Sequence, residues 1–418
     1  MSAPTAHNYR TGRVVGLAGT AALGGFLFGF DSAVINGAAS AIKSTFGLSS
    51  LALGFTVSIA LIGSAIGAWF AGMLAEKYGR RRVMLIAAAL FIAAALGQAF
   101  PFGIADLLVW RLIGGAGIGI ASVMAPMYIA EIAPAQLRGR LGSMQQLAIV
   151  LGIFATGITN YLILEAAGGN STSAWLFGIA AWQWMFLIMV IPALVYGAFA
   201  LQLPESPRYL VEVGRFDEAA SVLKQVYTGD INPILNDIKA SLDGESRPSI
   251  KDLRGRKFGL LPIVWVGIIL SAFQQFVGIN AVFYYSNTIW EAVGFSEDQA
   301  FQTSLITTGV NVAFTLVAIA LIDKVGRKPL LLVGSIGMFV MLAILSFVFG
   351  TAPIGPDGSP VLADGSDIVA LLAFNIYVAF FAATWGPVVW VLLGEMFPNR
   401  IRAAALALAT AVQWLANW

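Results

Sequence analysis

The sequence predicts an all-α integral membrane protein built from two similar halves. Of its 418 residues, 58% are hydrophobic and only 11% are charged, whereas soluble domains carry about 25% charged residues. Eleven apolar segments approach or exceed the roughly 20 residues that cross a bilayer. Charged loops found in the first half recur in the same order in the second half.

The apolar segments form two groups, separated by a long polar stretch. The expected spans are 14–39, 51–75, 83–101, 106–130, 141–165 and 176–203, followed by 258–290, 300–322, 329–350, 367–397 and 403–418. The polar stretch contains two segments with the apolar spacing of short helices, 217–224 and 232–239. We therefore expect a first bundle (1–203), a helical linker (204–257) and a second bundle (258–418).

Lysine and arginine are concentrated on one side of this topology. Apart from Lys43 and Arg111, they fall in the N-terminal tail, in every second loop, or at the edges of these regions. Cytoplasmic loops carry such an excess of positive charge. We therefore expect a multi-pass protein of the cell inner (plasma) membrane with its N-terminus in the cytoplasm.

Two kinds of charged loop occur once in each half. One places an acid three residues before a Gly-Arg pair, and the other places an acid seven residues before an arginine. These loops hold Glu76 and Arg80, Glu131 and Arg138, Asp323 and Arg327, and Glu395 and Arg402. The recurrence predicts two pseudo-symmetric six-helix bundles, an arrangement that in transporters places the substrate between the halves. The second bundle then lacks its last helix, so we expect a further segment beyond residue 418.

Seven motifs are distributed from the first apolar segment to the tenth. They are Gly25-Phe-Leu-Phe-Gly-Phe-Asp31, Gly79-Arg80-Arg81-Arg82, Pro126-Met-Tyr-Ile-Ala-Glu131, Arg138-Gly139-Arg140, Pro204-Glu205-Ser206-Pro207-Arg208, Gln274-Gln275-Phe-Val-Gly-Ile-Asn280 and Gly386-Pro387-Val-Val-Trp390. In this order they resemble the sugar porters of the major facilitator superfamily, especially bacterial proton–xylose and proton–glucose symporters. The resemblance implies a monomeric carrier that works by alternating access.

Two charged residues lie inside apolar segments. Asp31 and Arg111 occupy positions where a charge costs about 2.5 kcal/mol or more unless it pairs or reaches water. The helical rise places both in the outer part of the membrane, so that they can pair. Burial favours a neutral acid and a guanidinium favours a carboxylate, so opening to water changes that balance. We expect a proton-coupling site; the alternative is a static ion pair that fixes helix packing.

The resemblance supports the coupling hypothesis. Proton-coupled relatives carry an acid at the position of Asp31, whereas facilitative relatives carry a neutral amide there.

Amide and indole side chains are abundant in the later apolar segments. An amide both donates and accepts hydrogen bonds, and an indole offers a flat apolar surface, so the set suits a neutral sugar. A single amide can instead hold two helices together. The resemblance implies that the sugar-binding residues are Gln146, Gln274, Gln275, Asn280, Asn311, Trp390 and Gln413. We also expect Trp414 and Phe26 to line the site; the alternative for Phe26 is that it faces lipid. Gly278 indicates a bent or broken helix between Gln275 and Asn280.

Acids and bases also gather on the predicted cytoplasmic loops of both halves. They are Glu76, Arg80, Arg81, Glu131, Arg138, Glu205, Arg208, Asp323, Arg327, Glu395 and Arg402. We expect a cytoplasmic gate that ties the halves together when the cavity opens outward, because exposed ion pairs of about 0–1 kcal/mol each are readily broken. The alternative is that these charges only reflect membrane topology.

Together, these features predict proton-coupled symport of a monosaccharide, with D-glucose favoured over xylose or galactose by overall resemblance. The alternatives are a passive sugar facilitator and a non-transporting sugar sensor. An enzyme is not expected, because the chain has no cysteine and its one histidine, His7, lies in the polar tail. The expected partners are the sugar, the proton and the bilayer, with no cofactor, metal or nucleic acid.

Overall fold

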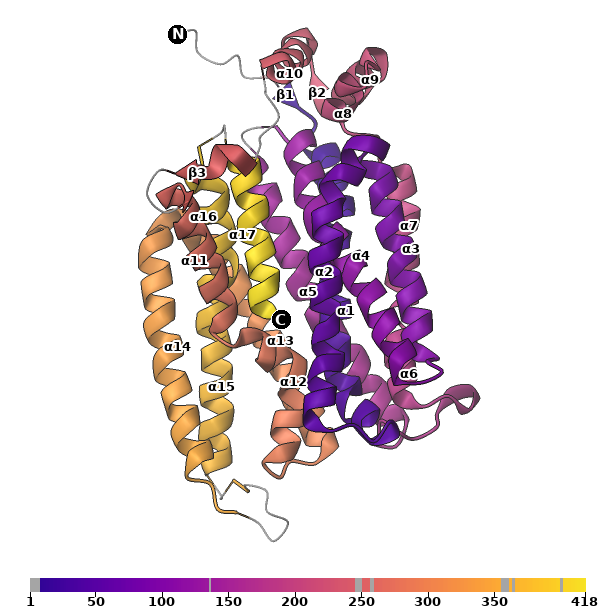
Figure 1. Cartoon of the computed structure of the whole chain (residues 1–418), viewed down its shortest axis with the longest axis vertical. Coiled ribbons are helices and arrows are strands. Elements are labelled where there is room, and N and C mark those ends of the chain that lie inside the picture. The colour runs from indigo at the N-terminus through magenta and orange to yellow at the C-terminus, as the bar shows by residue number, and fades with distance from the viewer. Residues whose placement is uncertain are drawn as a thin grey trace.

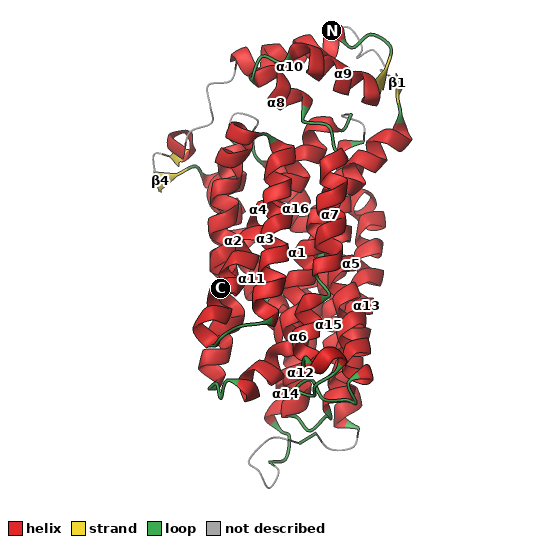
Figure 2. Ribbon diagram, turned by 90° about the vertical axis from the view of Figure 1, so that its right-hand side faces the viewer, coloured by secondary structure: helices red, strands yellow, loops and turns green. Residues whose placement is uncertain are grey.

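The computed structural model describes residues 8–134, 137–244, 250–255, 259–354, 361–362, 365–398 and 401–418. Long helices run side by side in two groups, and a layer of short helices covers one end (Figure 1). We call this end the linker end and the opposite one the far end. Seen after a quarter turn, the helices follow the long axis and the loops lie mostly at the two ends (Figure 2).

The first group contains the six spans expected before residue 204. Its helices are α1 (Thr11–Thr45), α2 (Ser50–Tyr78), α3 (Arg80–Ala99), α4 (Ile104–Ile132), α5 (Arg138–Ala166), α6 (Ala181–Leu187) and α7 (Val190–Gln202), with a 3₁₀ turn η1 (Leu176–Gly178) before α6. The sixth span is made of α6 and α7 together.

The linker forms a helical layer, as predicted. It contains α8 (Pro207–Glu212), α9 (Phe216–Val226), α10 (Asn232–Gly244) and the 3₁₀ turn η2 (Ile250–Leu253). Acids in the first turn of α9 and Lys224 in its last turn match the helix dipole. The sequence did not predict the short strands β1 (Asn8–Tyr9), β2 (Tyr227–Thr228), β3 (Arg254–Gly255) and β4 (Gly259–Leu260). The antiparallel β1–β2 pair fastens the start of the chain to the linker.

The second group contains the five spans expected after residue 257. Its helices are α11 (Pro262–Phe276), α12 (Ile279–Ala292), α13 (Glu297–Val325), α14 (Arg327–Gly350), α15 (Ser366–Ala383), α16 (Trp385–Met396) and α17 (Arg402–Asn417). The predicted break in the seventh span is confirmed, because Gly278 has a left-handed backbone with φ of 89° between α11 and α12. The tenth span is also broken, at Thr384.

Ten segments in the described part of the chain are long and apolar enough to cross a membrane. The eleventh expected span is α17, whose 16 residues extend about 24 Å, less than the roughly 30 Å of a bilayer core. The chain is therefore a multi-pass membrane protein.

Two helix pairs in the first group pack backbone against backbone. A Cβ added to Gly29 on α1 would lie 1.9 Å from the carbonyl oxygen of Ile149 on α5, and one added to Gly115 on α4 would lie 1.9 Å from that of Ala60 on α2. Such close packing is typical of small residues in membrane helices. These contacts fix the rotation of α1 and α4, which carry Asp31 and Arg111.

The internal repeat is visible in the backbone. Gly79 joins α2 to α3 with φ of 89° and ψ of 162°, and Gly326 joins α13 to α14 with φ of 88° and ψ of 164°. The arginine that follows each glycine donates from Nη1 to the carbonyl oxygen five residues before it, at 3.2 Å for Arg80 and 3.1 Å for Arg327. The two loops therefore share one conformation.

Candidate functional site

A cavity of about 120 Å³ lies between the two groups of helices. This volume exceeds several-fold the roughly 10–15 Å³ that one water needs. Helices α1 and α5 line one side, and helices of the second group line the other. Eight residues assigned from the sequence line it: Gln146, Gln274, Gln275, Asn280, Asn311, Trp390, Gln413 and Trp414. The same wall also holds Phe28, Ser32, Tyr284 and Asn417.

Gln274 is the centre of a hydrogen-bond network in this wall. Its Nε2 donates to the carbonyl oxygens of Trp385 and Gly386, at 3.0 Å each. Its Oε1 accepts from Nε2 of Gln275 at 3.3 Å and from Nε2 of Gln413 at 2.5 Å. All four positions of this amide are thus used within the protein. Gln274 links the end of α11 to the break between α15 and α16 and to α17.

The broken seventh span extends the network to Asn280. Its Nδ2 donates to Oε1 of Gln275 across the turn at Gly278. Further along the wall, Oε1 of Gln413, Nε1 of Trp414 and Oδ1 of Asn417 are buried without a hydrogen-bond partner in the described part of the chain. Buried polar atoms are normally paired, so these three unpaired atoms mark the part of the wall formed by α17.

Phe26 does not line the cavity, which corrects the assignment made from the sequence. Phe28 lines it instead and packs on Trp414 with ring centroids 5.5 Å apart. Phe26 lies two residues earlier, about 200° around the helix, and packs against Phe30 at 6.1 Å. The glycine contacts between α1 and α5 fix this rotation, which a single sequence does not reveal.

Asp31 and Arg111 are both buried, with 0% and 2% of their surface exposed. They do not form the direct ion pair that the sequence suggested. Neither carboxylate oxygen of Asp31 has a hydrogen-bond partner among the described residues. Arg111 donates instead to the carbonyl oxygen of Val57 at 2.9 Å and to Oε1 of Gln98 at 3.4 Å. The two charged residues lie close together along the membrane normal, as their positions in the sequence predicted. The side chain of Gln98 lies beside them and bonds to Arg111.

At the linker end, two ion pairs repeat the internal symmetry. Arg80 and Glu131 are 2.8 Å apart in the first group, and Arg327 and Glu395 are 2.6 Å apart in the second. Each guanidinium uses both Nε and Nη2, which is the strong two-point geometry. Both pairs join residues of one half, so in this conformation they stabilise each half internally.

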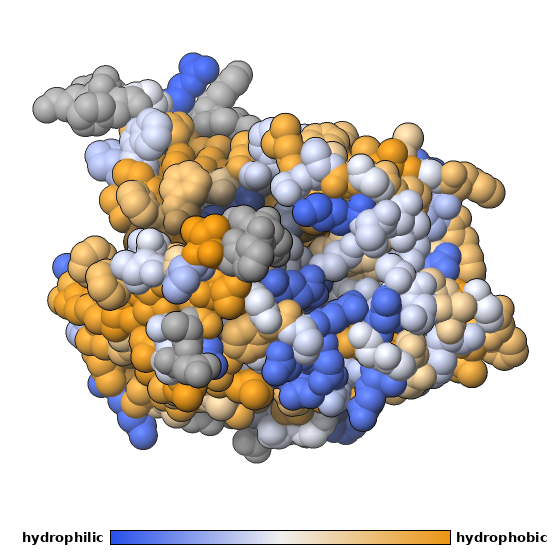
Figure 3. All heavy atoms as spheres, turned by 90° about the horizontal axis from the view of Figure 1, so that it is seen from below, coloured by the Kyte–Doolittle hydropathy of each residue, from blue (hydrophilic) through white to orange (hydrophobic). Residues whose placement is uncertain are grey.

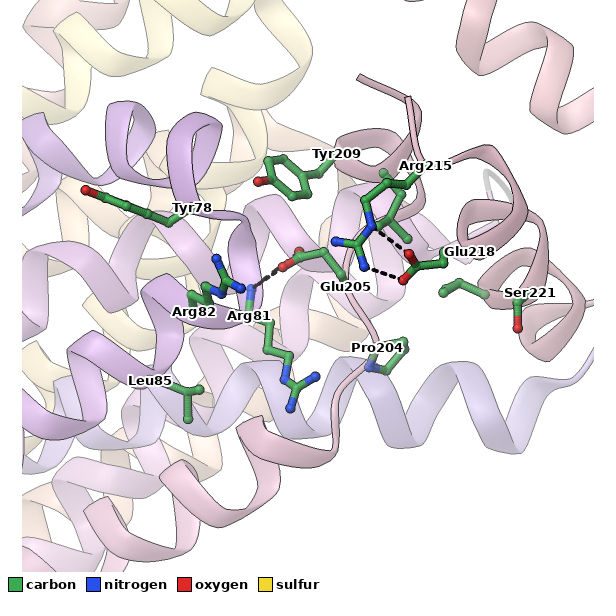
Figure 4. Close-up of a pocket in the computed structure, with 12 residues that line it drawn as sticks. Tyr78, Arg81, Arg82, Leu85, Pro204, Glu205, Tyr209, Arg215, Glu218 and Ser221 are labelled. Atoms are coloured by element: carbon green, nitrogen blue, oxygen red, sulfur yellow. Dashed lines mark hydrogen bonds and ion pairs between the residues drawn. The ribbon is translucent and has the colours of Figure 1, made fainter. Parts of the chain in front are cut away.

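Glu205 connects the linker to the first group. Its carboxylate accepts from the backbone N–H of Arg80 at 2.9 Å and of Arg81 at 3.3 Å, where α3 begins. Figure 4 shows this contact beside the Arg215–Glu218 ion pair, at a pocket of about 500 Å³. The hydrogen bond to Glu218 raises the pKa of Arg215.

The other residues of the expected cytoplasmic gate are less well defined. Glu76 is exposed and Arg208 is half-buried. The side chains of Arg138, Asp323 and Arg402 lie outside the described part of the structure.

The far end holds a polar contact between the halves that the sequence analysis missed. Asn36 on α1 donates to Ser286 at 3.0 Å and accepts from the backbone N–H of Asn287 on α12 at 3.1 Å. One turn further, Ser40 donates to Glu291 at 2.6 Å. We call these five residues the far-end latch. The spacing of four residues within each helix was the signal available in the sequence.

Part of the surface at the far end is polar. Seen from below, hydrophilic side chains gather over the centre and right of this face, and apolar ones lie at its left (Figure 3). Glu297 at the start of α13 adds a contact across the halves by accepting from the backbone N–H of Ser171 at 3.1 Å. The described contacts thus hold the two halves together at the far end.

Two groups of helices related by an internal repeat, with a polar cavity between them, define a membrane transporter. The family model described as "Sugar (and other) transporter" matches residues 17–418. The chain therefore belongs to this sugar transporter family, whose members are transporters and not enzymes.

Relatives and solved structures agree with this assignment. A glucose transport protein of Synechocystis sp. is 52% identical over 417 residues, covering 100% of this chain and 89% of the relative. A D-xylose-proton symporter of Escherichia coli is 39% identical over 437 residues, covering 98% and 85%. The structure of the proton:xylose symporter XylE bound to 6-bromo-6-deoxy-D-glucose matches with a TM-score of 0.81 and 38% identity, covering 98% of this chain and 87% of that one.

Proposed function

We propose that the protein is a proton-coupled monosaccharide symporter and that D-glucose is its substrate. The observation that carries this proposal is the pairing of an amide-lined cavity between the halves with a buried carboxylate, Asp31, on one of its helices. The 52% identity to a glucose transport protein supports the choice of sugar. The 39% identity to a D-xylose-proton symporter supports proton coupling.

Each assigned residue has a distinct role in this proposal. Asp31 takes up and releases the proton, and Arg111 responds to its charge. The sugar site is the cavity wall formed by Gln146, Gln274, Gln275, Asn280, Asn311, Trp390, Gln413 and Trp414. Within it, Gln274 acts by holding Gln275 and Gln413 in place. The wall offers unpaired donors and acceptors together with indole faces, which suits the hydroxyl groups and C–H surface of a sugar ring.

Transport proceeds by alternating access between two rigid halves. Residues 1–203 and 258–418 form the moving bundles, and residues 204–257 form the linker. The linker end faces the cytoplasm, because the lysines and arginines of the loops gather there. The far-end latch closes the outer side in the conformation described here. The charged loops at the linker end form the gate that closes when the latch opens, and the working unit in the bilayer is a monomer.

Uptake by the purified protein in liposomes tests this function. Radiolabelled D-glucose is expected to accumulate when the outside is made acidic, and unlabelled glucose is expected to compete more strongly than xylose or galactose. Equilibration without accumulation would leave a passive facilitator, and binding without any flux would leave a sensor.

A further inference from the structure

Gln98 on α3 contacts the proposed proton site, although no motif in the sequence singled it out. Its side chain is fully buried, with 0% exposed. Its Oε1 accepts from Nη1 of Arg111 at 3.4 Å. Its Nε2 has no hydrogen-bond partner among the described residues. The amide is thus oriented with its oxygen toward the guanidinium and one donor unused.

The unused donor of Gln98 and the unpaired carboxylate of Asp31 face the same gap. A Cβ added to Gly114 on α4 would lie 3.1 Å from Nε2 of Gln98 and 3.2 Å from Oδ2 of Asp31. Both groups therefore lie beside Gly114, where the absence of a side chain leaves room next to them. An unpaired donor and an unpaired acceptor in one buried gap are complementary.

We propose that Gln98 is a positioning residue of the proton site and links Asp31 to Arg111; this inference rests on the proposed proton-coupled function. An amide can accept through oxygen and donate through nitrogen at the same time, which no charged side chain does. Arg111 fixes the oxygen, so the nitrogen is presented to the carboxylate. The proton itself binds Asp31 from water and leaves it to water, while Gln98 only changes how well the carboxylate form is held.

The bridge explains how a buried acid and a buried guanidinium communicate without direct contact. A direct ion pair inside a protein is hard to break and costly to leave half-paired. An amide between them couples the charge of Asp31 to the position of Arg111 through two weaker hydrogen bonds. Such bonds can break and form again in every transport cycle. Among the described residues, the other titratable groups facing this pair are Tyr284 and Tyr285 on α12. Phenols with a reference pKa of about 10 stay neutral near pH 7.

The pH dependence of uphill sugar uptake in liposomes tests the bridge. A donor to a carboxylate favours its charged form, so Gln98→Leu is expected to let Asp31 take its proton at lower acidity. The midpoint of the uptake profile should move upward by about one pH unit, since a hydrogen bond to a charged group is of that size. Gln145→Leu is the matched control, because Gln145 is also buried in the first group with an unpaired amide.

A second variant keeps the glutamine and fills the gap. Gly114→Ala places a methyl group 3.1 Å from Nε2 of Gln98 and 3.2 Å from Oδ2 of Asp31. It should push the two side chains apart and move the midpoint in the same direction. Gly117→Ala is its control, because a Cβ there meets only ordinary contacts of 3.4 Å and beyond. Should Gln98→Leu not fold, Gly114→Ala decides the question alone.

The possible results are distinct. If the wild-type protein moves no protons with sugar, the proposed function fails. If the wild-type protein couples and the variants that fold keep its midpoint, Gln98 is only a packing residue and the inference is overturned. An upward shift in Gln98→Leu or Gly114→Ala that is absent from both controls supports the bridge, and a downward shift overturns it.

Discussion

Replacing Gln274 by alanine tests the organisation of the sugar cavity. The wild-type amide donates to the carbonyl oxygens of Trp385 and Gly386 and accepts from Gln275 and Gln413. The variant loses all four hydrogen bonds at once. Because only 2% of Gln274 is exposed, we expect its main effect to come from releasing Gln275 and Gln413 rather than from a lost sugar contact.

The expected loss of affinity follows from the two released glutamines. Holding a flexible side chain in place on binding costs about 0.5–1.5 kcal/mol. Two such side chains therefore cost about 1–3 kcal/mol. Since about 1.4 kcal/mol corresponds to a tenfold change, the Kd for the sugar is expected to rise roughly 5-fold to 150-fold.

Calorimetric titration of purified protein with D-glucose measures this change. Gln302→Ala is the control, because Gln302 is exposed at the far end and bonds only within its own helix, to Asp298 at 2.7 Å. Thermal unfolding of both variants verifies that they are folded. A Kd for Gln274→Ala within twofold of the wild-type value would refute the view that this amide organises the cavity wall.

Three further changes test other parts of the molecule. With a pH gradient of one unit and one proton per sugar, the wild-type protein should accumulate sugar about tenfold. Asp31→Asn should reduce this accumulation ratio to about one while sugar exchange continues. Uphill uptake by the variant would contradict this. Asn287→Ala should open the far-end latch and speed the labelling of a single cysteine introduced nearby. The labelling is specific to that cysteine because the chain has no cysteine of its own. Unchanged labelling would exclude a latch. Gly115→Ala should lower the unfolding temperature, because its Cβ would lie 1.9 Å from the carbonyl oxygen of Ala60. Such overpacking costs about 1–3 kcal/mol. Gly117→Ala should unfold at the wild-type temperature, and equal unfolding temperatures for both variants would contradict this.

Much of the fold is predictable because each membrane span is a long run of apolar residues in the sequence. Hydropathy located the spans, and a glycine next to polar residues predicted the break in the seventh span at Gly278. The repeat of charged loops predicted two similar halves, and the matching backbone at Gly79 and Gly326 agrees with that prediction. The linker helices followed from their apolar spacing. The strand pair between β1 and β2 was missed, because two-residue strands leave no pattern.

For the candidate site, the sequence predicted how deep each residue lies in the membrane but not which way its side chain faces. Apolar segments show how far along a helix a residue lies. The resemblance to sugar porters, and not this depth, selected seven of the eight cavity residues. The direction that each side chain faces depends on packing, such as the contact of Gly29 with α5. That contact turns Phe28 rather than Phe26 to the cavity. The position of Gln98 beside Arg111 likewise depends on the packing of the end of α3, far from the Arg80-Arg81-Arg82 motif at its start.

Proton movement that accompanies sugar entry is the most direct test of the account. Liposomes containing the wild-type protein are suspended in weakly buffered medium with no ion gradient, and D-glucose is added while the external pH is recorded. The account predicts an immediate rise in external pH that Asp31→Asn abolishes and L-glucose does not produce. Glucose entry with no change in external pH would contradict it.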